Sequence, residues 1–149
     1  MFNTQEVQTI EAAKAILANA LKTTDTALTN PSATKTFCQL EIAGLEHEVF
    51  GVLLLNNQHQ LIKFEIMFRG TIDGASVYPR EVAKAALLNN AAAVIFTHNH
   101  PSGITEPSQA DRRITERLSQ ALELLDIRTL DHIIVGPTET TSFAERGLL

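Results

Sequence analysis

Residues 91–114 read AAAVIFTHNHPSGITEPSQADRRI, and this stretch decides how the chain folds. Its apolar first part, Ala91–Phe96, predicts a buried strand. Pro101, Gly103 and Pro107 then break the chain, and Pro107 is suited to the start of the helix that follows. The pattern therefore predicts a strand, a loop and a helix, with polar side chains gathered where the strand runs out into the loop.

Some of these polar side chains could hold a metal ion. Side chains two residues apart in an extended backbone point the same way, so His98 and His100 can face one point in space. Asp111 is expected in the first turn of the helix. Two imidazoles and a carboxylate are ligands that zinc takes, and a three-ligand set leaves the fourth tetrahedral position for water, as in catalytic zinc sites. A structural zinc is more typically closed by cysteine thiolates, and this chain has only Cys38.

The same residues also fit a purely structural interpretation. Ser108 and Asp111 stand three residues apart, as in a variant of the helix capping box, where each side chain satisfies backbone N–H groups. Spacing alone leaves the metal site and the helix cap open as alternatives.

Composition limits the class of protein. A chain of 149 residues has the length of one domain and can bury about 68–70% of its unfolded surface. A single cysteine excludes an internal disulfide. The net charge is −5, from 12 basic and 17 acidic residues, which argues against a surface built mainly to neutralise phosphates. We therefore do not expect nucleic acid as a direct ligand.

The beginning of the sequence and its apolar runs bear on location. The start MFNTQ has neither the basic residues nor the apolar segment of a secretory signal. The longest apolar runs are far shorter than a membrane span. We expect a cytoplasmic protein with no membrane association.

The rest of the chain divides into a lead segment, 1–30, and a main domain, 31–149. Apolar residues recur at helical spacing over Gln5–Leu21, and packing on the chain's own domain is favoured over docking on a partner. Lys22–Pro31, rich in Thr and Asn, has the composition of a linker.

In the main domain, helices and strands alternate. This order predicts an α/β domain with helices against a mixed sheet. The expected helices run from Ser32 to about Ala43, Pro79 to about Asn90 and Ser108 to about Leu125, and the other strands are Glu48–Leu55, Gln60–Phe68, Asp131–Val135 and Thr141–Phe143.

Several side chains receive a structural interpretation. In the last helix, the apolar spacing predicts that Ala110, Ile114, Leu118, Ala121 and Leu125 are buried. Cys38 is expected to be a small packed residue, and His132 a packed or hydrogen-bonded residue of a strand, with neither acting in chemistry.

The order of motifs matches a known family. His98-x-His100, seven residues, Ser108, two residues and Asp111 form the pattern of the JAMM (MPN-plus) metalloproteases. The blocks HEVFGVLLLNNQHQLI, FRGTIDGASVYPREV, HNHPSG, PSQADRRIT, LDHIIVG and SFAERGLL resemble the RadC-like proteins, a bacterial branch of that superfamily. The resemblance covers about residues 31–149.

The resemblance implies a curved mixed sheet of the cytidine-deaminase-like MPN architecture and a zinc metalloprotease activity on a peptide or protein substrate. Zinc would be held by His98, His100 and Asp111 and would lower the pKa of its bound water towards about 7. Ser108 would donate a hydrogen bond to the tetrahedral intermediate. An upstream glutamate would act as the general base.

The general base is predicted to be Glu48. It leads into the apolar run HEVFGVLLL with Gly51 nearby, as in the MPN-plus pattern. Glu46 stands two residues earlier and could share its face, so it is the second candidate. Glu65 within a strand and Glu81 in a first helical turn fit a base less well.

Other functions are weighed against this one. A zinc deaminase shares the fold but would need H-x-E together with P-C-x-x-C, and neither is present. The HNH tripeptide does not match HNH nucleases, whose motif is spread over a ββα unit. Longer RadC-like proteins carry a helix-hairpin-helix region ahead of the metal domain, for which we expect no room here, so a DNA role inferred from it does not transfer. A non-catalytic metal-binding module in a DNA-processing or mobile-element context remains the alternative.

Overall fold

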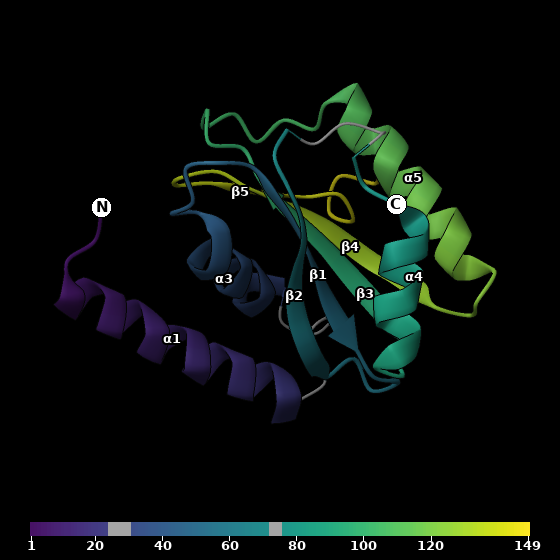
Figure 1. Cartoon of the computed structure of the whole chain (residues 1–149), viewed down its shortest axis with the longest axis horizontal. Coiled ribbons are helices and arrows are strands. Elements are labelled where there is room, and N and C mark those ends of the chain that lie inside the picture. Colours follow the sequence, from purple (N-terminus) through teal and green to yellow (C-terminus); the bar gives the residue numbers. More distant parts are fainter. Residues whose placement is uncertain (24–30, 72–75) are drawn as a thin grey trace.

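The computed structural model describes residues 1–23, 31–71 and 76–149 and contains one mixed sheet. The strand order is β2-β1-β3-β4-β5 (Figure 1). β1 runs antiparallel to both β2 and β3, β3 is parallel to β4, and β4 is antiparallel to β5, which confirms the predicted mixed sheet. The strands are β1 (Val49–Leu55), β2 (Leu61–Arg69), β3 (Ala93–Asn99), β4 (Arg128–Val135) and β5 (Thr140–Ser142).

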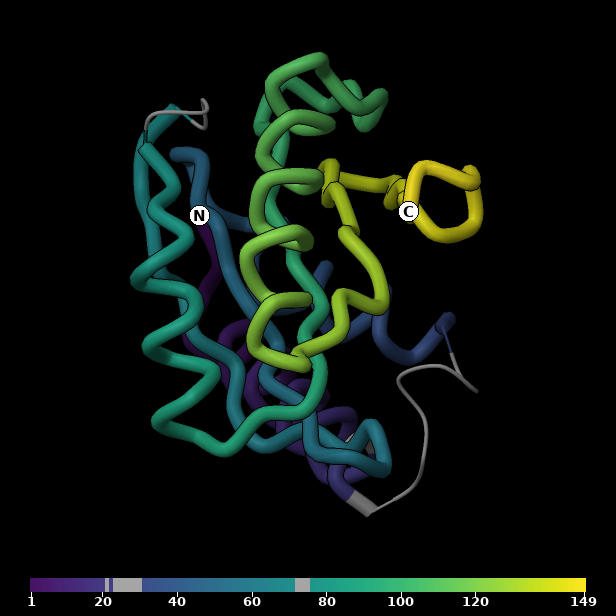
Figure 2. Tube along the Cα trace, turned by 90° about the vertical axis from the view of Figure 1, so that its right-hand side faces the viewer, coloured from purple at the N-terminus to yellow at the C-terminus, as the bar shows by residue number. Residues whose placement is uncertain are grey.

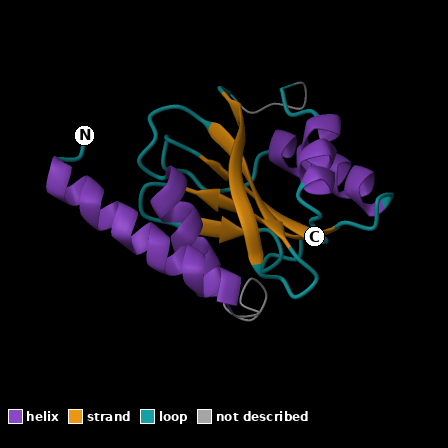
Figure 3. Cartoon of the chain, turned by 60° about the horizontal axis from the view of Figure 1, so that its bottom comes forward, coloured by secondary structure: helices purple, strands orange, loops and turns teal. Residues whose placement is uncertain are grey.

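Helices cover both faces of this sheet (Figures 1 and 3). On one side lie α1 (Thr4–Thr23) and α3 (Pro31–Ile42), and on the other lie α4 (Pro79–Leu88) and α5 (Gln109–Glu123). Figure 2 shows α4 and α5 side by side on their face. Among the helices of the described ranges, none is long and apolar enough to span a membrane.

β1 and β3 are buried along their whole length because both of their faces are covered. Alternate residues of β1 enter different cores. Phe50 and Val52 face the core under α4 and α5, whereas Leu53 and Leu55 face the core under α3. β1 and β3 thus lie between the two cores, and the polar end of β3 emerges from this packed region.

Gly51 allows β1 and β2 to pack closely. A Cβ atom at this position would lie 2.7 Å from a ring carbon of Phe64, and the register between the strands shifts between Phe50 and Gly51. Any larger residue would have to displace the Phe64 ring.

The strand that carries the histidines is longer at its end than the sequence predicted. β3 continues past Phe96 to Asn99, because its polar end still pairs with both neighbours: Phe50 lies opposite His98, and Asn99 lies opposite Val135. The predicted end at the last apolar residue was therefore wrong by three residues.

In α5, Ile114 and Leu118 are buried as predicted, and Leu122 follows them one turn later. Leu125 is 41% exposed, so the prediction that it is buried was wrong. The helix ends at Glu123, so Leu125 lies beyond it and does not continue its buried face.

The lead helix α1 packs on α3, and its Leu17 and Ala18 contact the core beneath α3. Its first turns are more open, since Val7 is 44% exposed. α3 already includes Pro31, so the helix begins one residue before the predicted start at Ser32. Most of the predicted linker lies outside the described residues.

Candidate metal centre

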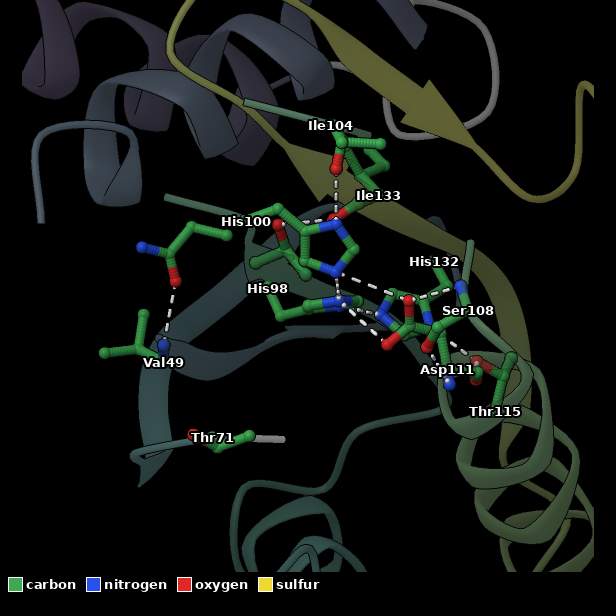
Figure 4. A network of polar contacts seen from close by, with 12 residues as sticks. Val49, Thr71, His98, His100, Ile104, Ser108, Asp111, Thr115, His132 and Ile133 are labelled. Carbon is green, nitrogen blue, oxygen red and sulfur yellow. Dashed lines mark hydrogen bonds and ion pairs between the residues drawn. The ribbon is translucent and has the colours of Figure 1, made fainter. Parts of the chain in front are cut away.

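The end of β3 and the first turn of α5 bring two imidazoles and a carboxylate together (Figure 4). His98 Nε2 lies 2.8 Å from His100 Nε2 and 3.1 Å from Asp111 Oδ1. His100 Nε2 lies 3.3 Å from Asp111 Oδ2. In the part of the chain that the structure describes, this is the one group of side chains placed to share a metal ion.

The donor set fits a metal ion such as zinc. Ligand atoms that each stand about 2.0–2.1 Å from a tetrahedral zinc lie roughly 3.3–3.4 Å from one another. With one ligand atom taken from each residue, the three atoms lie within 4.8 Å of one another, and the two imidazole nitrogens are 2.8 Å apart, so small side-chain shifts would bring the donors to these separations. His98 and Asp111 are buried and His100 is half-buried, which leaves one side of the centre open.

A hydrogen bond fixes the tautomer of His100. Its Nδ1 lies 2.6 Å from the carbonyl oxygen of Ile104, which can only accept, so Nδ1–H is the donor. The lone pair of the neutral ring is therefore on Nε2, facing His98 and Asp111. Ligating histidines are commonly oriented by such a bond from their second nitrogen.

The helix cap and the metal site occupy the same residues. Ser108 Oγ accepts from the backbone N–H of Asp111 at 3.0 Å, and the backbone N–H of Ser108 donates to Asp111 Oδ2 at 2.8 Å. This capping box is complete. It fixes the rotamer of Asp111 while Oδ1 faces His98, so the two interpretations left open by the spacing are compatible.

The carboxylate of Asp111 is held in its charged form. Burial acts to raise its pKa, but the imidazoles of His100 and His98, which donate to the carboxylate when they are protonated, outweigh this and hold the pKa well below its usual range. The same contact with Asp111 raises the pKa of His100 against the effect of burial. An anionic ligand is thus preorganised among the imidazoles.

Asn99, between the two histidines, points to the other side of the strand. Its side-chain oxygen accepts from the N–H of Val49 at 2.8 Å, and its amide donates to the carbonyl oxygens of His47 at 3.0 Å and Leu45 at 3.4 Å. These bonds hold the backbone on both sides of Glu48. The sequence analysis assigned no role to Asn99. The alternation of side chains along a strand could have placed it on the face opposite His98 and His100.

Glu48 lies on the open side of the centre. A cleft of about 300 Å³ contains Glu48 together with His100, Ser108 and Asp111. The charge of Glu48 also contributes to the raised pKa of His100, as a smaller cause than Asp111. Glu46 is exposed and is not among the residues that line this cleft. The rest of the lining is Thr71, Ser102, Ile104 and Glu106.

A larger hollow, of about 600 Å³, lies near the end of α5, lined by Asp126, Arg128 and Leu149 among others. Its lining includes none of the residues of the histidine cluster, and size alone does not make it a site. The chemistry of the smaller cleft is the stronger guide.

His132 and Cys38 have the structural roles that the sequence predicted. His132 is fully buried in β4, with its ring stacked on Phe143 at 4.7 Å, and burial lowers its pKa well below 6.5. Cys38 is buried in the core under α3.

Comparison with known proteins agrees with this architecture. The profile of the family described as RadC-like JAB domain matches residues 28–148. The chain belongs to this family. It is 60% identical over 145 residues to a UPF0758 protein of Vibrio cholerae serotype O1, covering 97% of this chain and 91% of that protein.

Longer members of the RadC-like JAB domain family are also similar. A UPF0758 protein of Saccharophagus degradans is 59% identical over 138 residues, which are 93% of this chain and 61% of that protein. One of Nitrosococcus oceani is 56% identical over 146 residues, 98% of this chain and 65% of that protein. The chain thus spans under two thirds of the length of these two relatives, and their names state no reaction.

Proposed function

We propose that this protein is a zinc-dependent hydrolase of JAMM type that cleaves a peptide or isopeptide bond. The observation that carries the proposal is one cleft in which Glu48 and Ser108 lie with His100 and Asp111, two members of the three-ligand metal cluster that His98 completes from behind. Metal-assisted hydrolysis of an amide requires ligands, a proton carrier and a donor for the oxyanion, and this cleft has a candidate for each.

The metal would be held by His98, His100 and Asp111. Zinc bound there would supply a Lewis acid that makes water reactive near neutral pH. An open coordination position is needed for this chemistry, and the open side of the cluster faces the cleft that Glu48 lines.

Glu48 would act as the proton carrier. Its carboxylate would accept a proton from the attacking water and deliver it to the nitrogen of the leaving amine. The half-buried position of Glu48 on the cleft suits both steps, since it can reach substrate while Asn99 holds the backbone of the residues on either side, His47 and Val49.

Ser108 would donate a hydrogen bond to the oxyanion of the tetrahedral intermediate. In the capping box its oxygen accepts from the N–H of Asp111, and this uses a lone pair of the hydroxyl. The O–H remains a donor, so capping and oxyanion stabilisation can coexist in one side chain.

The acidic net charge of −5 favours a peptide or protein substrate over nucleic acid. The half-buried and exposed residues of the cleft leave it accessible to an extended chain, and Ile104 at its border is 69% exposed and offers an apolar contact.

The test combines metal analysis with a cleavage screen. We expect about one zinc per chain by mass spectrometry in the parent, and loss of that zinc in His98→Ala and Asp111→Asn. Asparagine at position 111 keeps an oxygen for the N–H of Ser108, so α5 should stay capped while the charge is lost. Unchanged zinc content in both variants would remove the ligand assignment.

A peptide-library screen of the zinc-loaded parent then tests hydrolysis. We expect cleavage that a chelator abolishes and added zinc restores. Stoichiometric zinc without turnover across a broad library of peptides and isopeptides would contradict the hydrolase and favour a non-catalytic metal-binding module.

A further inference from the structure

His132 lies behind His98, on the side away from the cleft, and has no part in the function proposed above. The imidazole is fully buried in β4. Three phenylalanine rings surround it, with centroids 4.7 Å away for Phe143, 5.5 Å for Phe50 and 5.9 Å for Phe96. A buried polar ring in apolar surroundings is costly unless its nitrogens are hydrogen-bonded, so its partners are informative.

Both ring nitrogens of His132 have partners, and these contacts link His98 to Asp111 through His132 and Thr115 (Figure 4). His98 Nδ1 lies 2.7 Å from His132 Nε2. His132 Nδ1 contacts Thr115 Oγ1 at 2.5 Å, and Thr115 Oγ1 lies 2.7 Å from the carbonyl oxygen of Asp111. The chain therefore begins at one candidate metal ligand and ends on the backbone of another.

The direction of each hydrogen bond follows from the chemistry of the last acceptor. The carbonyl oxygen of Asp111 can only accept, so the single hydroxyl proton of Thr115 is donated to it. Thr115 Oγ1 must then accept from the Nδ1–H of His132. A neutral imidazole has one N–H, so His132 Nε2 holds a lone pair and accepts from another donor.

That donor is His98 Nδ1–H, which leaves the lone pair of His98 on Nε2. Nε2 is the atom that faces His100 and Asp111. The reverse direction would place a proton on His98 Nε2, where it would stand between the ring and a metal ion. Ligands must be deprotonated at the binding atom, so the two directions differ in metal affinity.

We propose that Thr115 and His132 are positioning residues that fix His98 in the Nδ1–H tautomer and so prepare Nε2 to bind the metal. This inference rests on the metal-binding part of the proposed function and not on hydrolysis. Asp111 then acts twice, through its carboxylate as a ligand and through its carbonyl as the end of the chain that orients His98. Outer partners of this kind usually account for 10- to 100-fold in metal affinity.

The test compares two substitutions at one position. Thr115→Val keeps the shape of the side chain but removes the acceptor for His132 Nδ1–H, whereas Thr115→Ser keeps the hydroxyl. Zinc affinity is measured by competition with a chromophoric chelator. We expect about 10- to 100-fold weaker binding in Thr115→Val and near-parent binding in Thr115→Ser. Equal affinity in the parent and Thr115→Val would overturn the proposal.

The tautomers are measured separately, from the imidazole ¹⁵N spectra of the protein. In the parent we expect His132 protonated at Nδ1 with and without zinc, and His98 protonated at Nδ1 when zinc is bound. A parent spectrum with His132 protonated at Nε2 would refute the inferred direction, even if Thr115→Val does not fold. Because both readouts concern binding and protonation, they remain valid if the protein proves not to hydrolyse any substrate.

Discussion

The side-chain oxygen of Asn99 accepts a hydrogen bond from the backbone N–H of Val49 at 2.8 Å, and this contact joins the histidine strand to the segment that carries Glu48. The Asn99 amide also donates to the carbonyl oxygen of His47, on the other side of Glu48. The residue between the two candidate metal ligands therefore fixes the backbone position of the candidate base.

Asn99→Ala should destabilise the fold and loosen Glu48. Loss of the side chain leaves the buried N–H of Val49 without this acceptor, at a cost of about 1–3 kcal/mol in the free energy of unfolding. We expect the zinc content to stay near that of the parent, because His98 and His100 face the other side of the strand. Urea unfolding and metal analysis check these two expectations.

Asn99→Asp is the matched control for this change. It keeps an oxygen for Val49, but it replaces the amide that donates to the carbonyl oxygens of His47 and Leu45 with a buried carboxylate oxygen, so it should be no more stable than Asn99→Ala. If Asn99→Ala loses as much zinc as Asp111→Asn does, Asn99 supports the metal ligands and not the segment that carries Glu48.

Ser108 is predicted to have two separable contributions. Ser108→Ala removes the cap of α5 and should cost about 0.5–2 kcal/mol of stability. Loss of an oxyanion donor should slow turnover about 100- to 1000-fold. Thermal or denaturant unfolding measures the first effect, and kinetics on a cleaved peptide measures the second.

Ser108→Gly separates these effects, since glycine at an N-cap costs only a few tenths of a kcal/mol relative to serine. We expect Ser108→Gly to be nearly as stable as the parent and as slow as Ser108→Ala. A variant that is less stable but fully active would show that Ser108 acts as a cap alone.

The sequence was sufficient to predict the layered α/β fold, because apolar runs and helical spacing mark which segments are covered on both faces. It did not reveal how far β3 extends, since Thr97, His98 and Asn99 are polar and look like loop residues. They are buried because partners from distant segments satisfy them: Thr97 donates to the carbonyl oxygen of Ile133, and Asn99 binds residues near Glu48.

The candidate site shows the same limit. Local spacing identified His98, His100, Ser108 and Asp111, since these lie close in sequence and their geometry follows from a strand and a helix start. The contact between His98 and His132 joins residues 34 positions apart through the parallel pairing of β3 and β4. Periodicity within one segment carries no information on such a pairing.

Because the thiol of Cys38 is buried, we expect the free energy of unfolding to fall at alkaline pH. Burial raises the pKa of its thiol to about 12 from its ordinary value of 9.0, which we expect the exposed thiol of the unfolded chain to keep. Between these two pH values the thiol loses its proton in the unfolded chain and keeps it in the folded chain. The stability that Cys38 contributes is therefore complete below pH 9 and is lost as the pH rises towards 12. The free energy of unfolding should fall by up to about 1.4 kcal/mol per pH unit from this group.

The measurement is urea unfolding of the parent and of Cys38→Ala at pH 8 and pH 10. The variant has no thiol, so its free energy of unfolding should fall less between the two pH values than that of the parent. Equal losses in both proteins would show that Cys38 ionises as easily in the folded state as in the unfolded one.

The last prediction distinguishes the two glutamates ahead of β1. Glu48 lines the cleft with His100 and Asp111, whereas Glu46 is exposed and outside that lining. Glutamine keeps the shape of the side chain but cannot take up a proton, so Glu48→Gln should bind zinc like the parent and react about 100- to 10,000-fold more slowly. Glu46→Gln is the matched control and should keep parental activity. Zinc content and the rate of peptide cleavage are measured on both variants. Slow turnover in Glu46→Gln with a normal Glu48→Gln would move the base to Glu46, and full activity in both would remove this segment from the mechanism.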